Sequence, residues 1–256
     1  MSTRKAGILL TSVSAFLLNL SVALAFDFIV GEFEEIQSVS EEIMTKFPPN
    51  QYFYVGVGRS PTPFMAYIQA IDPTASVNIP ISSFRARLTG ASSSYHHPLS
   101  LEHEAKLNRH FMKLLNLEQI GNRKILLIDF SERGDTLISL NQYLSKYLRL
   151  THKPNKVEML ALASPNNFDR IATNMRGTNN ATVISLRERP LLSSKLTLQR
   201  YDPVAEYGAF HIWNPDARTD DLKPNEEFID FRKSISRKLK PTTVQCLKTA
   251  LVGIFR

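Results

Sequence analysis

Side chains that can bind an anion follow an apolar run in the stretch KILLIDFSERGDTLISL, residues 124–140. Four apolar residues lead to an aspartate, a short polar loop follows, and an amphipathic segment comes next. This order predicts a buried strand, a tight loop and a helix. The backbone amides of such a loop, at the positive end of the following helix, form a site for phosphate or another anion. The strand end and the loop contain Asp129, Ser131, Gly134, Asp135 and Thr136.

A second loop of the same kind follows the aromatic and β-branched run YFYVGVG, residues 52–58. Its candidate ligand-binding residues are Arg59, Ser60 and Thr62. A planar, permanently charged guanidinium suits a phosphate group. The alternative is a rigid turn that starts a helix, because Pro61 and Pro63 each remove a backbone N–H that could bind an anion.

The segment IDFSERGDT resembles the ribose-phosphate loop of type I phosphoribosyltransferases. In that family a hydrophobic strand ends in two acidic residues and leads to a small-residue loop that closes with Gly, any residue and Thr. The resemblance implies that Asp129 binds the ribose, that the loop 131–136 binds its phosphate, and that Arg59 lies against the donor pyrophosphate. It implies Mg²⁺ only for an active enzyme. Two features depart from the family: Phe130 replaces the second acid, and the loop before Gly134 is one residue shorter.

A polar run, LTGASSSYHHPLS at residues 88–100, resembles by its place in the chain the mobile flap of that family. Four histidines lie in and after this run: His96, His97, His103 and His110. Their spacing does not place them together on one helix turn, so we expect solvated or capping histidines and no metal site. The single cysteine, Cys246, excludes an internal disulfide and a cysteine-based zinc cluster.

Apolar runs near residues 52, 77, 125, 157 and 181 alternate with segments of helical periodicity. This alternation predicts an α/β fold with a parallel, helix-flanked sheet, phosphoribosyltransferase-like by the resemblance above, and an irregular C-terminal extension. We expect the run 125–128 in the centre of the sheet, between the strands at 52–57 and 157–163. Pro80 indicates an edge position or irregular pairing for the strand at 77–82. Ligands of such sheets bind at the carboxyl ends of the strands, where Arg59 and Asp129 both fall.

The first 25 residues have the layout of a secretory signal: Arg4 and Lys5, an apolar run, and Ala23-Leu24-Ala25. The alternative is an uncleaved membrane anchor, since the run approaches the length that spans a bilayer. Polar residues within the run favour the signal. We therefore expect cleavage after Ala25, a mature chain that begins at Phe26, and a secreted or periplasmic protein.

Beyond the signal we expect a phosphoribosyltransferase-like domain over residues 26–190 and an accessory segment, 191–256, packed on that domain. Within the segment, residues 226–239 form a basic amphipathic helix with one apolar stripe: Phe228, Phe231, Ile235 and Leu239. Trp213, with Phe210 and His211, either stacks on a ligand base or packs the segment on the domain. We favour packing.

The formal net charge is +7, and early glutamates leave the rest of the chain more basic than this total. Such a charge favours an anionic partner, here a phosphorylated small molecule. No nucleic-acid-binding motif accompanies the charge, and we expect no membrane contact after signal cleavage. The glutamates lie on one face of a helix expected at residues 31–47, and we expect that face to be solvated rather than a docking surface.

Two functions fit these patterns. The first is an active phosphoribosyltransferase that acts on a nitrogenous acceptor, with the alternative that it is delivered as an effector into another cell, where its donor is available. The second is an exported protein that keeps the fold and part of the pocket as a binding or interaction module. Phe130, the two prolines and the signal favour the binding module, because the first two depart from the family at positions that the chemistry needs and the donor is an intracellular metabolite.

Overall fold

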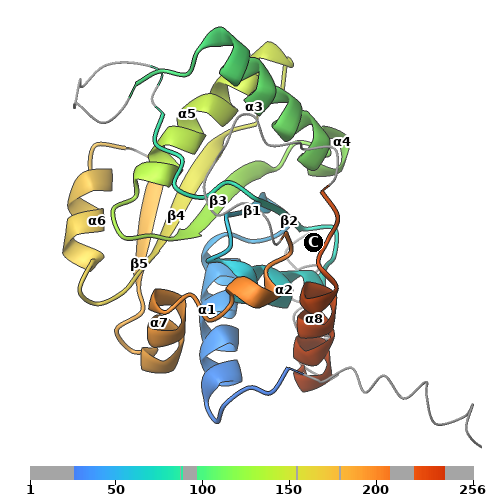
Figure 1. Ribbon diagram of the computed structural model, residues 1–256, viewed down its shortest axis with the longest axis vertical. Coiled ribbons are helices and arrows are strands. Elements are labelled where there is room, and N and C mark those ends of the chain that lie inside the picture. Colours follow the sequence, from blue (N-terminus) through green and yellow to red (C-terminus); the bar gives the residue numbers. More distant parts are fainter. Residues whose placement is uncertain are drawn as a thin grey trace, which may run out of the picture.

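The computed structural model describes residues 26–86, 88, 97–153, 155–178, 180–207 and 222–239. The expected signal, most of the expected flap, Cys246 and the aromatic group of Phe210, His211 and Trp213 lie outside the described residues. Within them, parallel strands form one sheet in the order β2-β1-β3-β4-β5 (Figure 1). The strands are β1 (Tyr52–Val57), β2 (Ser76–Ile79), β3 (Lys124–Phe130), β4 (Val157–Ala163) and β5 (Ala181–Ser185).

The central strand is β3, which pairs in parallel with β1 on one side and with β4 on the other. Leu127 lies opposite Val55 of β1 and Met159 of β4, and all three side chains are fully buried. A strand that is apolar along its length is expected where helices cover both faces of a sheet. The predicted parallel α/β sheet, its central strand and the edge position of β2 are therefore confirmed.

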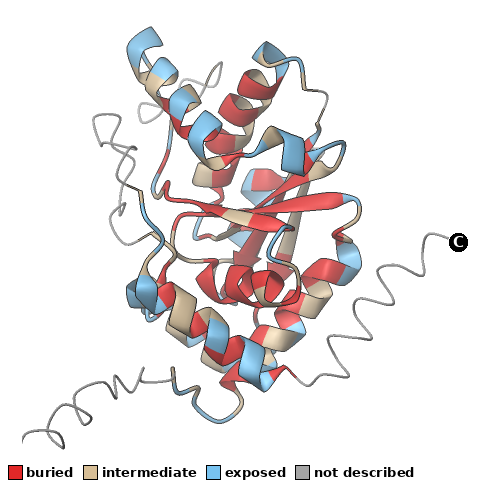
Figure 2. Ribbon diagram, turned by 90° about the vertical axis from the view of Figure 1, so that its right-hand side faces the viewer, coloured by how far each residue is buried: buried red, intermediate tan, exposed pale blue. Residues whose placement is uncertain are grey.

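Helices cover both faces of the sheet, so that the strands lie in a buried middle layer (Figure 2). Successive residues of β3 point to opposite faces: Leu126 and Ile128 to one, Ile125 and Leu127 to the other. The first face is covered by α1 (Glu32–Lys46), α2 (Thr62–Ile71), α7 (Pro190–Thr197) and α8 (Glu226–Lys238). The second is covered by α3 (Leu101–Leu114), α4 (Leu117–Ile120), α5 (Asp135–Leu150) and α6 (Phe168–Met175).

The acidic face of α1 is a docking surface within the chain. Glu32 Oε2 lies 2.6 Å from Lys195 Nζ, and Glu42 Oε2 lies 2.8 Å from Arg189 Nη2. Glu35 accepts a hydrogen bond of 2.8 Å from a backbone N–H in the first turn of α7. The expectation that this face is solvated is therefore wrong for these three glutamates, because they hold α7 against α1.

The helix α8 completes the same layer. Its predicted stripe is confirmed: Phe228, Phe231, Ile235 and Leu239 are buried in one cluster with residues of α1 and α2. The Phe26 ring packs edge-on against Phe231, with 4.6 Å between the ring centroids. The first described residue and a late helix thus stabilise each other.

His110 of α3 differs from the expectation of a solvated or capping histidine. Its side chain is fully buried between α3 and the sheet layer. Burial, with a smaller contribution from Lys113, lowers the pKa of His110 to about 4. The imidazole is therefore neutral at physiological pH and forms part of the interior.

Candidate functional site

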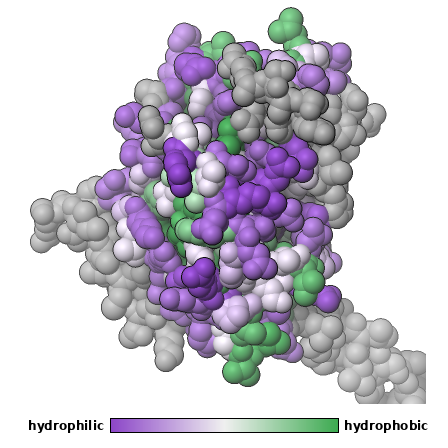
Figure 3. Space-filling view, turned by 90° about the vertical axis from the view of Figure 1, so that its left-hand side faces the viewer, coloured by the Kyte–Doolittle hydropathy of each residue, from purple (hydrophilic) through white to green (hydrophobic). Residues whose placement is uncertain are grey.

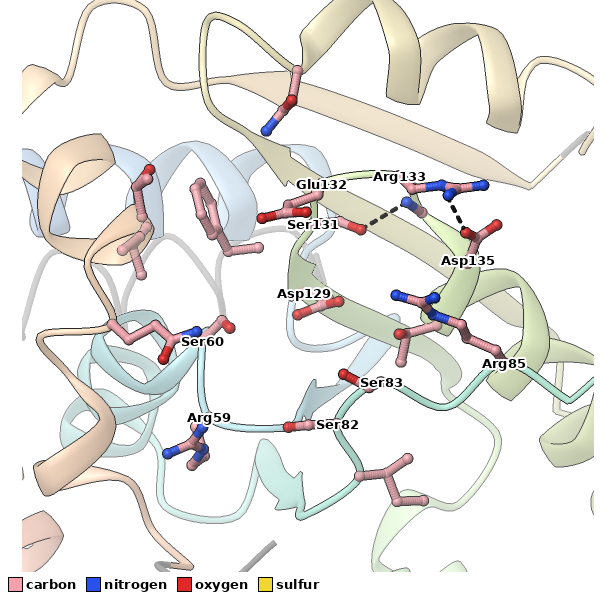
Figure 4. A pocket seen from close by; sticks show the side chains of 18 of the residues that line it. Arg59, Ser60, Ser82, Ser83, Arg85, Asp129, Ser131, Glu132, Arg133 and Asp135 are labelled. Atoms are coloured by element: carbon pink, nitrogen blue, oxygen red, sulfur yellow. Dashed lines mark hydrogen bonds and ion pairs between the residues drawn. The ribbon is translucent and has the colours of Figure 1, made fainter. Parts of the chain in front are cut away.

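A cavity of about 240 Å³ opens at the carboxyl ends of the strands (Figure 4). It lies among the loops that follow β1, β2, β3 and β4, and the chain after α7 forms its remaining wall. From β1 the chain crosses to β2 on one side and later to β3 on the other, so the strand order reverses at this point. Doubly wound sheets bind ligands at such a reversal. All predicted site residues except Thr62 line this cavity: Arg59, Ser60, Asp129, Ser131, Gly134, Asp135 and Thr136.

Thr62 serves the backbone instead of the cavity. It is buried at the start of α2, and its hydroxyl donates a hydrogen bond of 2.5 Å to the carbonyl oxygen of Arg59. Pro61 is the N-cap of α2 and Pro63 lies in its first turn. The loop after β1 is therefore a rigid turn that starts a helix, as the alternative interpretation predicts, while Arg59 and Ser60 still face the cavity.

The loop between β3 and α5 is closed by its own serine. Ser131 Oγ accepts a hydrogen bond of 2.7 Å from the backbone N–H of Gly134. Gly134 has a φ of 81°, in the left-handed region that favours glycine, and it is the N-cap of α5. Gly134 has no side chain that could cap the N-terminus of α5. The N-cap residue therefore leaves the first amides of this helix uncapped.

Helix α6 binds the outer side of this loop. Arg170 Nη2 donates to the carbonyl oxygen of Glu132 (2.8 Å), and Asn174 Nδ2 donates to that of Arg133 (3.0 Å). In a planar trans peptide the N–H of the next residue points opposite to the carbonyl. The N–H groups of Arg133 and Gly134 therefore point away from α6, and that of Gly134 is already bound to Ser131 Oγ. Backbone amides that point inward are a frequent form of anion site, and the N–H of Arg133 fits this role.

Internal carboxylates bind two of the guanidinium groups at the cavity. Arg59 Nη1 lies 2.6 Å from Asp202 Oδ2, and Arg133 Nε lies 3.1 Å from Asp135 Oδ2. Asp202 begins the short 3₁₀ helix η1 (Asp202–Val204), which follows α7. The guanidinium groups are thus largely neutralised by the chain itself.

Asp129 ends the polar side of β3 and lies between Ser60 and Arg85 in Figure 4. Its carboxyl group is only partly exposed. Burial raises the pKa of Asp129 to about 8, although a hydrogen bond from the backbone N–H of Phe130 opposes the shift. At neutral pH most molecules therefore carry a protonated Asp129, which can donate a hydrogen bond as well as accept one.

The Phe130 ring packs against the hydrophobic cluster under α1 and α2, while the residue also touches the rim of the cavity. An aromatic side chain at this position fills core volume, as expected for a residue that continues a buried strand. No second carboxylate lies beside Asp129 in the position where the resembled family has one.

Several residues of the cavity were not predicted from the sequence. Ser82, Ser83 and Arg85 follow β2 and line the cavity, so the rule that located Arg59 and Asp129 at strand ends would also have located them. Asp202 lies in a turn that is distant in sequence from these loops, and no sequence pattern predicts that this turn reaches the cavity. Glu132 and Arg133 lie inside the predicted loop, but the loop pattern of the resembled family specifies neither position.

Among the described residues, no group of three or more histidine, cysteine or acidic side chains is arranged to hold a metal ion. Within the same residues, no helix is both long and apolar enough to cross a membrane. The side of the molecule near β5 and α6 is mostly hydrophilic, with apolar side chains in small patches (Figure 3). Comparisons with protein family models, with curated proteins and with solved structures give no match.

Proposed function

We propose that this protein is an exported binding module whose cavity holds a small phosphorylated ligand of the ribose-phosphate class. One observation carries the proposal. Arg59 and Ser60 of the first predicted loop, and Asp129 and Thr136 of the second, line one polar cavity at the point where the strand order reverses. The two loops belong to different crossover units, so the cavity that they share is evidence that neither motif gives by itself.

The cavity offers separate groups for the two parts of such a ligand. The uncapped amides at the start of α5 and the Thr136 hydroxyl suit a phosphate, since the helix dipole favours negative charge there. Asp129 and the hydroxyls of Ser60 and Ser83 suit sugar hydroxyls, which both donate and accept hydrogen bonds. A volume of about 240 Å³ lies below the roughly 300–1,000 Å³ of pockets for drug-sized ligands, which favours a small ligand.

Three departures favour binding over transfer. Phe130 packs into the core, so Asp129 has no acidic partner for the sugar. Arg59 is paired with Asp202, which weakens its attraction for a leaving pyrophosphate. Thr62 is turned into the backbone of α2. Each departure concerns a group that the resembled enzymes use, and none of them prevents a phosphate from binding at α5.

A second candidate, an active phosphoribosyltransferase, is favoured by the raised pKa of Asp129. Perturbed acids gather at catalytic sites, and a carboxyl group with a pKa near 8 can hold or release a proton at neutral pH. Such an enzyme would break the bond from the ribose carbon to pyrophosphate and form a bond to an acceptor nitrogen. Mg²⁺ belongs to this candidate alone, and no described residue is assigned to it.

Isothermal calorimetry of residues 26–256 with ribose 5-phosphate tests the proposal, and ribose serves as the ligand without phosphate. We expect binding of ribose 5-phosphate and a Thr136→Val variant that binds more weakly, because the variant loses one donor to the phosphate. Thr173→Val is the matched control, since Thr173 is exposed on α6 and does not line the cavity. No heat at millimolar ligand would argue against the binding module.

Two further measurements address the remaining parts of the proposal. Phosphorus NMR of phosphoribosyl pyrophosphate with Mg²⁺ and an amine acceptor would detect released pyrophosphate if the protein is an enzyme. Intact-mass analysis of the exported protein should give a chain that starts at Phe26. Retention of residues 1–25 would contradict export by a cleaved signal.

A further inference from the structure

Arg59 and Asp202 form an ion pair, and both residues line the cavity. The distance from Arg59 Nη1 to Asp202 Oδ2 is 2.6 Å, and the side chains are only 12% and 19% exposed. A guanidinium group binds a carboxylate and a phosphate through the same donors. A ligand phosphate that approaches Arg59 therefore meets a carboxylate that already holds those donors.

Asp202 is held at the cavity by contacts of its own backbone and of its neighbour Tyr201. The hydroxyl of its neighbour Tyr201, which is buried, donates a hydrogen bond of 2.7 Å to Glu32 Oε1. Glu32 is itself fully buried and is bound by Lys195 at 2.6 Å. The backbone N–H of Asp202 donates to the carbonyl oxygen of Gln199 (3.2 Å), and Gln199 has a left-handed φ of 55°. The turn after α7 is thus anchored to α1, and it delivers the carboxylate into the cavity.

Arg59 keeps unused capacity for a second oxyanion. A guanidinium has five N–H donors in a planar fork. Its Nε is buried and has no hydrogen-bond partner among the described residues. The side chain is 12% exposed and Nε is its buried part, so a phosphate reaches Arg59 at the terminal nitrogens, where it competes with Asp202.

We infer that Asp202 is an internal competitor that sets the affinity and selectivity of the cavity. This inference rests on the proposed function. A phosphate monoester carries close to two negative charges at neutral pH, whereas the Asp202 carboxylate carries one. Since Coulomb attraction grows with charge, a phosphate dianion displaces the carboxylate from Arg59, while a ligand with a single carboxylate does not. The pair thereby restricts the cavity to phosphorylated ligands.

Calorimetry of the Asp202→Asn variant with phosphoribosyl pyrophosphate, without Mg²⁺, tests the inference, because the proposed function places a lone 5-phosphate at the start of α5 and leaves Arg59 to the pyrophosphate. Asparagine keeps the shape of the side chain but cannot compete for Arg59 as a charge, so we expect the affinity to rise about tenfold, which equals about 1.4 kcal/mol. Asp169→Asn is the matched control, because Asp169 is exposed on α6, loses the same charge and does not line the cavity. We expect that control to change the affinity threefold at most. Arg59→Gln in the Asp202→Asn background should remove the gain.

Acetate gives a second readout that a change of net charge alone would not produce. In Asp202→Asn, acetate at tens of millimolar should weaken the binding of phosphoribosyl pyrophosphate by replacing the missing carboxylate on Arg59. The wild-type protein at the same ionic strength should show no such effect. Thermal melts of each variant verify that the fold is retained.

The outcomes separate the inference from the proposed function. Weaker binding by Asp202→Asn would mean that Asp202 orients Arg59, and equal gains in both acid variants would reduce the effect to net charge. Either result, or wild-type binding that Asp202→Asn leaves unchanged, overturns the inference while the binding function stands. Failure of both the wild type and Asp202→Asn to bind either phosphoribosyl pyrophosphate or ribose 5-phosphate would overturn the inference and the proposed function together.

Discussion

Gly134 lies directly under Met175 of α6, so closely that a Cβ atom on residue 134 would come within 3.0 Å of both Met175 Cγ and Sδ. The glycine also has a φ of 81°, which side chains rarely permit. Position 134 therefore requires glycine for its backbone angle and for the close approach of Met175. The side chain that obstructs position 134 belongs to the protein interior rather than to a ligand.

The change Gly134→Ala should lower the free energy of unfolding by about 1–3 kcal/mol, because it combines a left-handed backbone with a close contact. Gly177→Ala is the matched control, since a Cβ there meets nothing within 4 Å. Urea denaturation of both variants measures the difference. Equal stability of Gly134→Ala and the wild type would show that the loop and α6 separate easily, in which case the loop geometry described above would not persist in solution.

Glu32 and Glu34 are neighbours in sequence with opposite environments. Glu32 is fully buried and is bound by Lys195, by Tyr201 and by the backbone N–H of Ile29, whereas Glu34 is exposed. Removing one partner of a buried ion pair leaves the other charge uncompensated and costs about 3–5 kcal/mol. Glu32→Ala should therefore strongly lower the melting temperature, and Glu34→Ala should leave it within about a degree or two of the wild type.

The same two residues show which part of the fold can be predicted from the sequence. Apolar periodicity placed each strand within a few residues, and the expected bounds of the strand at 157–163 are those of β4. Periodicity also places Glu32 and Glu34 on α1, but it does not tell a glutamate that meets solvent from one that meets a lysine on a distant helix. Helix α7 was not predicted from the sequence. Its first turn is held by Glu35, which lies far away in the chain, and periodicity does not report such a contact.

The candidate site divides in a similar way. Arg59 and Asp129 follow buried strands, and a parallel sheet brings such positions to one edge whatever else the chain does. Asp202 depends on the turn after α7, on the left-handed Gln199 and on the anchor of Tyr201. Tertiary contacts of that kind leave no periodic signal, so the carboxylate that pairs with Arg59 was beyond prediction.

Phe130 gives a prediction that separates packing from binding. Its ring packs against the core cluster beneath α1 and α2. Phe130→Asp should therefore place a carboxylate against apolar side chains, destabilise the protein by a few kcal/mol and give no gain in affinity for ribose 5-phosphate. Phe130→Leu, which keeps an apolar side chain, should cost less. Thermal melts and calorimetry of the two variants check both expectations. A stable Phe130→Asp protein with tighter binding would mean that the acid restores a working sugar site.

The contribution of Asp129 to the stability of the fold should fall as the pH rises, whereas that of most carboxylates in folded proteins increases. Its pKa rises from 3.8 to about 8 on folding, so between these pH values the folded state holds a proton that the unfolded state has released. The unfolded state then binds fewer protons, and the contribution of Asp129 to the free energy of unfolding falls as the pH rises. Asp129→Asn removes this contribution, because asparagine is neutral at every pH.

The stability of Asp129→Asn relative to the wild type should therefore increase between pH 5 and pH 8, by an amount on the order of 3 kcal/mol. Urea denaturation of both proteins at the two pH values measures it. His110, with its pKa lowered to about 4, acts in the opposite direction, but it is present in both proteins and cancels in the comparison. The same variant should bind ribose 5-phosphate more weakly and inorganic phosphate unchanged, because the proposed function assigns Asp129 to the sugar and the start of α5 to the phosphate. A stability difference that does not change with pH would show that the Asp129 carboxylate is well solvated. Asp129 would then be ionised at neutral pH and could not donate a hydrogen bond to the sugar.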